Sequence, residues 1–282
     1  MVYIPVDVEK SVAKECKRRN YSEKTVKSYI YCINRFLKYT NKSLDKISKR
    51  DVRLFLEYLS EKSMAGNTMN LYHMAIRFLF EDVLDKRIWI DIKYSKTPER
   101  IPVVLSKEEI KSLFNAVKNQ KHKLIIQLMY SAGLRVSELI NLKANDLDIN
   151  KGYGFVRKGK GSKDRIFIIA DSIKEELRRF IETKKLNEFD YLFTSKKGRK
   201  YNVSSPRNVI KKACKIAKIE KNISCHTLRH SFATHLIEDG YSISEVQSLL
   251  GHKSPETTFV YVHIASPNMI KVKSPLDSIK FN

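Results

Sequence analysis

Apolar residues in the first ninety positions recur every three or four residues, which is the spacing of one face of an amphipathic α-helix. This pattern predicts helices over residues 6–18, 23–39, 49–62 and 68–84. Gly66 and Asn67 are expected to break the chain before the last of them, and Ser22 and Ser48 stand where two of the helices need an N-cap. Four helices with short connections predict a compact bundle.

The helical periodicity is interrupted between residues 92 and 104, where Pro98 and Pro102 stand among alternating charges. Proline disfavours the interior of both helices and strands, so this stretch predicts a linker between two domains. Directly after it, Ser106 and Glu109 have the spacing of a capping box. This pair predicts that a helix restarts there and runs to about residue 117.

The remaining sequence mixes helical and strand-like patterns. Further helices are predicted over residues 123–133, 172–185, 206–217, 227–239, 244–250 and 255–261. Short strands are predicted over 154–157 and 165–170, joined by the glycine-containing turn 158–164, with another extended segment over 191–194. The expected fold class is mainly α, with a small antiparallel β-sheet in the second domain. The expected boundaries are a first domain over 1–91, a linker over 92–104, a second domain over 105–265 and a tail over 266–282.

The composition excludes several classes of protein. The chain has 282 residues, 42% of them hydrophobic and 30% charged, which is enough apolar material for a buried core. No stretch without a charged side chain exceeds 14 residues, for example 63–76, and the first residues lack the apolar stretch of a signal peptide. We therefore expect no membrane association and a cytoplasmic location.

The charge balance points to a polyanionic partner. Lysine and arginine number 54 against 31 acidic residues, a net charge of +23, and the excess is present in both halves of the chain. Such an excess favours nucleic acid binding, although a lysine-rich proteome would produce it as well. Cys16, Cys32, Cys214 and Cys225 form no C-x-x-C pair, so reduced and buried thiols are expected.

Four places combine polar residues in a way that indicates chemistry. The first is Arg135, which follows Gly133 at the end of an apolar helix and opens a further helical stretch. A guanidinium at a helix start would strengthen the attraction of that end for a phosphate. An ion pair between Arg135 and a carboxylate such as Glu138 is the simpler alternative.

The second place is Lys160, which stands between Gly159 and Gly161 in the predicted turn. The glycines free the backbone to place the lysine at the tip, where it could reach a DNA groove or a scissile phosphate. Lys163 and Arg165 are close by and compete for either role. A solvated loop lysine is the alternative interpretation.

The third place contains His226 and Arg229, which are three residues apart and therefore share a helix face. Both could donate hydrogen bonds to one phosphate. A zinc site built from His226, His230 and His235 is a rival hypothesis. However, the sequence lacks His-Glu-x-x-His, and residues 226 and 235 have the wrong angular separation on a helix for joint ligation. We expect no metal.

The fourth place runs from Gly251, expected to end a helix, through His252 in the following turn to Tyr261 on a short helix. A tyrosine acts as a covalent nucleophile when neighbouring groups activate it. With 14 tyrosines in the chain, Tyr261 taken alone could equally be a core or interface aromatic.

Together these residues resemble a known signature. In chain order it comprises Arg135, Lys160, His226, Arg229, His252 and Tyr261, and it is similar to that of the tyrosine recombinase (phage integrase) family. The blocks G-L-R-V-S-E-L, G-K-G, H-x-L-R-H-x-F-A-T-H-L and L-G-H-x-x-x-x-T-T-x-x-Y resemble Xer recombinases in particular. The resemblance implies a SAM-like core-DNA-binding domain followed by a catalytic domain of the DNA breaking–rejoining fold, which together clamp duplex DNA.

The resemblance also implies a role for each residue. Tyr261 becomes the nucleophile that forms a 3′-phosphotyrosyl bond and leaves a free 5′ hydroxyl. Arg135 and Arg229 supply planar cations for the phosphate oxygens, and Lys160 protonates the departing 5′ oxygen. His226 and His252 donate hydrogen bonds and exchange protons near neutral pH. Because bond energy is conserved, we expect no ATP, metal or other cofactor.

The implied partner is double-stranded DNA with a specific recombination site. Free monomers or dimers would assemble into a tetramer on two sites and act through a Holliday junction, most simply to resolve chromosome dimers in the nucleoid, with a DNA translocase as a candidate activator. The tail 266–282 is expected to dock on a neighbouring protomer, or else on its own domain. The alternatives are a mobile-element integrase or resolvase, a type IB topoisomerase and a catalytically silent DNA-binding protein.

Overall fold

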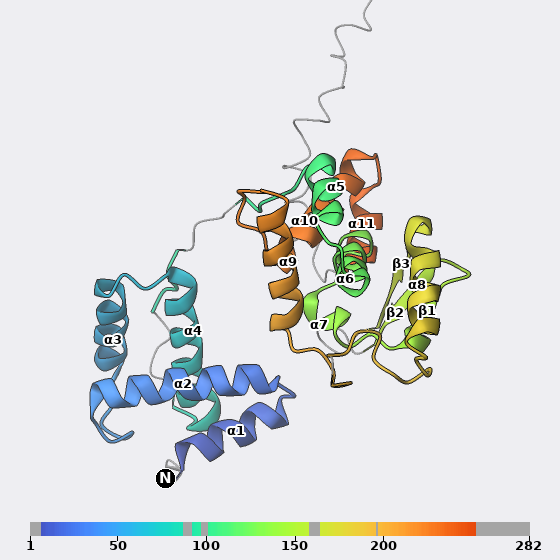
Figure 1. The fold of residues 1–282 in the computed structure, drawn as a ribbon. Helices are drawn as coiled ribbons and strands as arrows, with labels where there is room; N and C mark the ends of the chain where they lie inside the picture. The colour runs from blue at the N-terminus through green and yellow to red at the C-terminus, as the bar shows by residue number, and fades with distance from the viewer. Residues whose placement is uncertain (1–6, 87–91, 97–100, 158–163, 196, 252–282) are drawn as a thin grey trace, which may run out of the picture. The chain divides into compact units, whose positions relative to one another are not determined.

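Figure 1 shows the chain in a computed structural model, which describes residues 7–86, 92–96, 101–157, 164–195 and 197–251. The chain divides into two compact units, Met1–Arg100 and Ile101–Asn282, and each is described by itself. Within the described ranges, none of the helices is both long and apolar enough to cross a membrane. All four cysteines are free and buried, which confirms the expectation for the thiols.

The first unit is helical, as its periodicity predicts. Its elements are α1 (Val8–Arg18), α2 (Glu23–Thr40), α3 (Lys49–Glu61), α4 (Gly66–Arg77) and the π-helix η1 (Phe78–Val83). The side chain of Ser22 accepts a hydrogen bond from the backbone N–H of Thr25, which confirms Ser22 as the N-cap of α2. At the start of α3, the backbone N–H of Ser48 donates to the Asp51 carboxylate at 2.9 Å.

Two details of the last predicted helix are wrong. Gly66 does not break the chain but is the first residue of α4, because the N–H groups of a first turn need no intrahelical partner and a glycine is tolerated there. The helix is α-helical only to Arg77 and continues as η1. In this π-helix Phe78, Leu79 and Phe80 are all buried.

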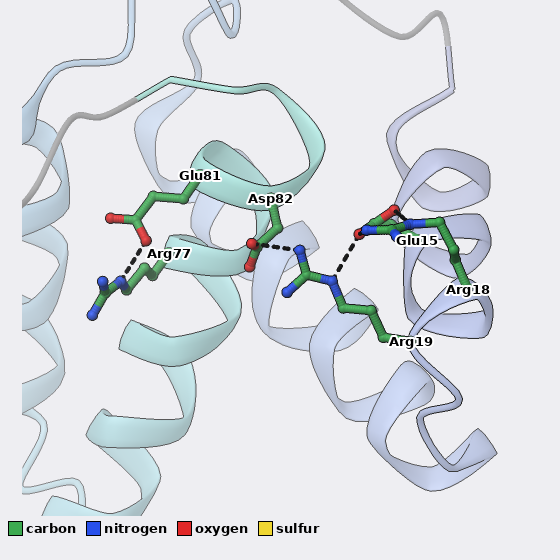
Figure 2. Close-up of polar contacts among 6 residues, drawn as sticks. All are labelled: Glu15, Arg18, Arg19, Arg77, Glu81 and Asp82. Carbon is green, nitrogen blue, oxygen red and sulfur yellow. Dashed lines mark hydrogen bonds and ion pairs between the residues drawn. The ribbon is translucent and has the colours of Figure 1, made fainter.

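An arginine joins the first helix of this unit to the π-helix. Figure 2 shows Arg19 between Glu15 and Asp82, with Nε at 2.7 Å from a Glu15 oxygen and Nη2 at 2.6 Å from an Asp82 oxygen. Arg18 binds the same glutamate, and its hydrogen bond, together with that of Arg19, outweighs desolvation and lowers the pKa of Glu15 to about 2. The pair between Arg19 and Asp82 links the end of α1 to η1.

Both ends of the predicted linker are attached to their own unit. Asn70 on α4 accepts from the Ser95 N–H at 2.8 Å and donates to the Ser95 carbonyl at 3.0 Å. At the other end, the buried Leu105 donates its N–H to the Ser231 hydroxyl at 3.0 Å. The boundaries drawn at 91 and 104 stay predictions.

The second unit is mostly helical. Its helices are α5 (Lys107–Asn115), α6 (Gln120–Ser131), α7 (Val136–Leu139), the 3₁₀ helix η2 (Ala144–Asp146), α8 (Asp171–Thr183), α9 (Ser204–Ile216), α10 (Cys225–Glu238) and α11 (Ile243–Leu250). The capping box before α5 is confirmed, because Ser106 and Glu109 exchange hydrogen bonds of 2.7 and 3.2 Å. The apolar α6 is the central helix, and α5, α8, α9 and α10 pack against it.

A small antiparallel sheet completes this unit and confirms the expected fold class. It contains β1 (Leu147–Asp148), β2 (Tyr153–Val156) and β3 (Arg165–Ile168) in that order. The register pairs Val156 with Arg165, so β2 and β3 form the predicted hairpin. The two-residue β1 is too short to leave a pattern in the sequence. The segment expected to be extended over 191–194 forms only isolated bridges, among them Lys143 with Tyr191.

Candidate active site

Three of the six predicted site residues lie in the described part of the structure: Arg135, His226 and Arg229. Lys160, His252 and Tyr261 lie outside the described residues, as do the helix predicted over 255–261 and the tail. The three described residues come from two places in the fold. Arg135 precedes α7, and the other two lie near the start of α10.

Arg229 is buried on α10 and holds two other segments in place. Its Nη1 donates to the carbonyl oxygen of Gly133, and its Nη2 donates to that of Leu250, both at 2.6 Å. Gly133 lies two residues before Arg135, and Leu250 is the last residue of α11. The guanidinium therefore holds the loop after α6 and the end of α11 against α10. Because both acceptors are neutral carbonyl groups, they do not neutralise its positive charge.

Gly133 is required at its position for two reasons. Its φ angle is +57°, a conformation that side chains with a Cβ rarely adopt. A Cβ added there would also lie 2.6 Å from a ring carbon of Phe232 and 3.0 Å from a methyl carbon of Leu250. The absence of a side chain lets the loop after α6 approach α10 closely enough for the Gly133 carbonyl to reach Arg229.

Arg135 is the N-cap of α7 and forms the ion pair considered as the alternative in the sequence. Its Nη1 lies 2.6 Å from Glu138 Oε1, and its backbone N–H donates to Oε2 of the same carboxylate at 2.9 Å. The Arg135 side chain is 20% exposed, so part of it is open to solvent. The helical stretch that follows Arg135 has four residues. A single turn has little dipole, so attraction for a phosphate must come from the side-chain charge.

Glu138 and Arg165 are parts of this site that sequence reasoning did not assign. Glu138 is buried, and its Oε2 also accepts a hydrogen bond from Arg165 Nη2 at 2.7 Å. Burial raises the pKa of Glu138, but the charge of Arg165 and the hydrogen bonds from Arg135 outweigh it, so the net shift is downward. The carboxylate is therefore ionised at neutral pH. The sequence indicated Glu138 only as an ion-pair partner of Arg135, three residues earlier, and did not predict its second contact with Arg165.

Arg165 does not fit the groove-reaching role for which it competed with Lys160. Its side chain is only 8% exposed. Besides Glu138, it binds the carbonyl oxygen of Leu249 at 2.5 Å through Nη1. An arginine held in this way inside the protein is not available to enter a DNA groove.

His226 lies in the electrostatic field of both site arginines. Partial desolvation lowers its pKa, and the positive charges of Arg229 and Arg135 lower it further, with a smaller effect from Arg207 on α9. The imidazole is therefore neutral in the free protein near pH 7, and an approaching phosphate would favour its protonation. His226 and Arg229 lie one turn apart on α10, and Arg229 binds the carbonyl oxygen of Gly133, two residues before Arg135. A shared catalytic role for the three residues stays a prediction.

The other two histidines of α10 occupy more buried positions. The ring centre of His230 lies 6.4 Å from that of His226, and burial together with the charges of His226 and Arg229 lowers its pKa to about 4. His235 is in hydrogen-bond contact with the Tyr130 hydroxyl through Nδ1 at 2.8 Å. Across the described residues, no three His, Cys, Asp or Glu side chains group in a way that could hold a metal ion.

Comparisons with known proteins identify the family of the chain. Residues 103–267 match the phage integrase family, and residues 10–91 match the phage integrase N-terminal SAM-like domain. The chain is 34% identical to the tyrosine recombinase XerA of Thermococcus kodakarensis, with 89% of each chain covered. It is also 34% identical to XerD of Oceanobacillus iheyensis, covering 89% of this chain and 91% of the relative.

The fold is also that of a solved recombinase. The chain superimposes with a TM-score of 0.73 on the XerH site-specific recombinase bound to palindromic difH DNA in a post-cleavage complex, at 23% identity and with 95% of this chain and 85% of that one covered. Because the two family matches span most of both units, the chain belongs to the phage integrase family and is a site-specific tyrosine recombinase of the Xer type.

Proposed function

We propose that this recombinase cuts one DNA strand at a time through Tyr261 and rejoins it to a second duplex through a Holliday junction. The observation that carries the proposal is the contact of Arg229, one helical turn after His226 on α10, with the carbonyl oxygen of Gly133, two residues before Arg135. The positive field of the two arginines, which also lowers the pKa of His226, acts at this place. A phosphodiester that enters this field would have its non-bridging oxygens neutralised as charge develops on them. Arg135 and Arg229 are the donors in this step.

The remaining roles complete the proposed reaction. The Tyr261 hydroxyl oxygen attacks phosphorus and loses its proton to a neighbouring base, while the bond from phosphorus to the 5′ oxygen breaks. Lys160 gives a proton to that oxygen, and His226 and His252 donate hydrogen bonds to the phosphate. One phosphodiester is exchanged for one phosphotyrosyl ester, so the step needs neither ATP nor a metal ion.

We further propose that the biological role is resolution of chromosome dimers in the nucleoid. This role is the one that the resemblance to Xer recombinases implies, and relatives named XerA and XerD and the XerH recombinase bound to palindromic difH substrate are of that type. A net charge of +23 favours a double-stranded DNA partner. Monomers or dimers would assemble into a tetramer on two sites, with the tail 266–282 docked on a neighbour and a DNA translocase as a candidate activator.

The test uses nicked suicide duplexes. Cleavage beside the nick releases a short fragment with the 5′ hydroxyl, so the strand cannot be rejoined and the covalent adduct accumulates. Binding sites are first selected with this protein from a randomised duplex pool. A denaturant-resistant protein–DNA adduct on the selected site supports the proposal. Relaxation of a supercoiled plasmid that lacks the site would instead favour a type IB topoisomerase. Binding without any adduct would mean a catalytically silent DNA-binding protein.

The biological role needs a separate experiment. Deletion of the gene should produce filamented cells with unsegregated chromosomes, because dimers would persist at division. A normal phenotype, with the selected site located at the ends of a mobile element, would instead indicate an integrase or resolvase.

A further inference from the structure

Arg165 connects three segments of the second unit through a single side chain. It is the first residue of β3, it binds Glu138 on α7 through Nη2, and it binds the Leu249 carbonyl of α11 through Nη1. Each segment is adjacent in sequence to a predicted site residue. Lys160 lies five positions before Arg165, Arg135 precedes α7, and His252 follows the C-cap residue of α11.

The end of α11 lies directly against the stem of this arginine. Gly251 caps α11 with a φ angle of +61°, and a Cβ added to it would lie 2.8 Å from Arg165 Cδ. Glycine is therefore needed both for the left-handed turn and for the close approach. The two hydrogen-bonding ends of the guanidinium then bridge Glu138 and Leu249, which are 111 positions apart in the chain.

The charges of this network explain why two arginines share one carboxylate. Glu138 carries one negative charge, and Arg135 and Arg165 carry one positive charge each. The sum is +1, so a net positive charge remains next to the partly exposed Arg135 side chain. Without Arg165, the carboxylate would neutralise Arg135 alone, and the electrostatic attraction of this part of the site for a phosphate would weaken.

We propose that Arg165 is a positioning residue for strand cleavage. It offsets the charge of Glu138, so that a net positive charge remains at Arg135, and it fixes the end of α11. The proposal rests on the proposed function, since it concerns the phosphate site of that reaction. Arg165 does not itself touch the DNA. Its guanidinium fork is required because a lysine offers one charged nitrogen and cannot span the Glu138 carboxylate and the Leu249 carbonyl with the same geometry.

The experiment compares Arg165→Met, Arg165→Lys and a matched control, Arg157→Met. Arg157 follows β2 and pairs with the buried Asp146 at 2.7 Å, so the control also removes one charge and one arginine–carboxylate pair from the same hairpin. Three quantities are measured for each folded variant: DNA affinity by gel shift, single-turnover adduct formation on a nicked duplex at saturating protein, and amide hydrogen exchange of residues 133–140 and 247–251.

We expect Arg165→Met to slow adduct formation at least about tenfold, with affinity within about threefold, because the lost interaction acts on the transition state. Arg165→Lys keeps the charge but not the fork, so its rate should fall between those of Arg165→Met and the wild type. Both variants should exchange faster in the two segments, including the Arg135 amide that donates to Glu138. Arg157→Met should change neither the rate nor the exchange.

Several results would overturn the inference. An unchanged rate of adduct formation in Arg165→Met would do so. Lower DNA affinity with a wild-type rate at saturating protein would also do so, because a residue that contacts DNA directly gives that result. If Arg165→Met does not fold, a wild-type rate together with wild-type exchange in Arg165→Lys rejects the positioning role. If the wild type forms no adduct on any selected duplex, the proposed function fails separately. In that case the amide hydrogen exchange of the two segments still tests the positioning role, and unchanged exchange in both Arg165 variants rejects it.

Discussion

The guanidinium of Arg229 donates a 2.6 Å hydrogen bond to the carbonyl oxygen of Gly133, a residue 96 positions earlier in the chain. This contact joins the middle of the second unit to its C-terminal helices and places a buried cation next to the loop that carries Arg135. The same guanidinium also binds the end of α11. One side chain thus organises the candidate site and supplies it with charge.

Arg229→Ala should reduce strand cleavage at least about 100-fold, by comparison with the ~2.7–4 kcal/mol lost on removing an oxyanion donor. Arg229→Lys should rescue poorly, because a point charge cannot reach two carbonyls and a phosphate in a planar arrangement. Single-turnover adduct assays at saturating DNA give the rates, and circular dichroism checks the fold. Near-native cleavage by a folded Arg229→Lys variant would contradict the planar-donor role.

Tyr261→Phe should abolish the covalent adduct and preserve DNA binding, because it removes one hydroxyl and almost no volume. Adduct formation is measured on the nicked duplex and binding by gel shift under the same conditions. If Tyr261→Phe still forms a denaturant-resistant adduct, the nucleophile is a different tyrosine, and Tyr241 is the second candidate to substitute.

Gly133→Ala should destabilise the second unit by about 1–3 kcal/mol, since it combines an unfavourable φ with a clash against Phe232. Gly198→Ala is the matched control, because Gly198 also has a positive φ, +70°, but its Cβ would meet nothing within 4 Å. Thermal unfolding should show the larger loss for Gly133→Ala, and cleavage should slow only in that variant. Equal losses in both would mean that backbone strain, not the approach to α10, dominates.

DNA binding should weaken steeply with salt, with log K falling by ~0.9 per log unit of salt for each phosphate neutralised. Cleavage should persist in EDTA, because the arginines provide the electrostatic stabilisation of the phosphate. Affinity is titrated at several salt concentrations, and adducts are quantified with and without chelator. Cleavage that is lost in EDTA and restored by magnesium or zinc would identify a metal-dependent nuclease instead.

Deletion of residues 269–282 should leave binding of one protomer to a half-site nearly intact, because all six predicted site residues lie upstream. Cooperative occupancy of a duplex with two half-sites should weaken, since Ile270, Val272, Leu276 and Ile279 would no longer bury against a neighbour. Gel-shift titrations on one and two half-sites measure both effects. Unchanged cooperativity would show that the tail packs on its own domain.

The sequence by itself determined the local elements and the order of the chemistry. Ser22 caps α2 and Ser106 caps α5 because those hydrogen bonds join residues three apart, and Gly251 ends α11 as the pattern indicates. The shared helix face of His226 and Arg229 was also predictable from their spacing. The recombinase signature could be found in the same way, because it consists of residue types in a fixed order.

Only the tertiary structure decided which distant groups meet. The contacts of Arg229 with Gly133 and Leu250, and of Arg165 with Glu138 and Leu249, join residues between 21 and 96 positions apart, and no short-range pattern encodes them. Such contacts depend on how whole helices pack, because a few ångströms of displacement would exchange one partner for another. For this reason the sequence left Arg165 as a competitor of Lys160 for a DNA-contacting role, whereas packing places it against Glu138 and Leu249 inside the protein.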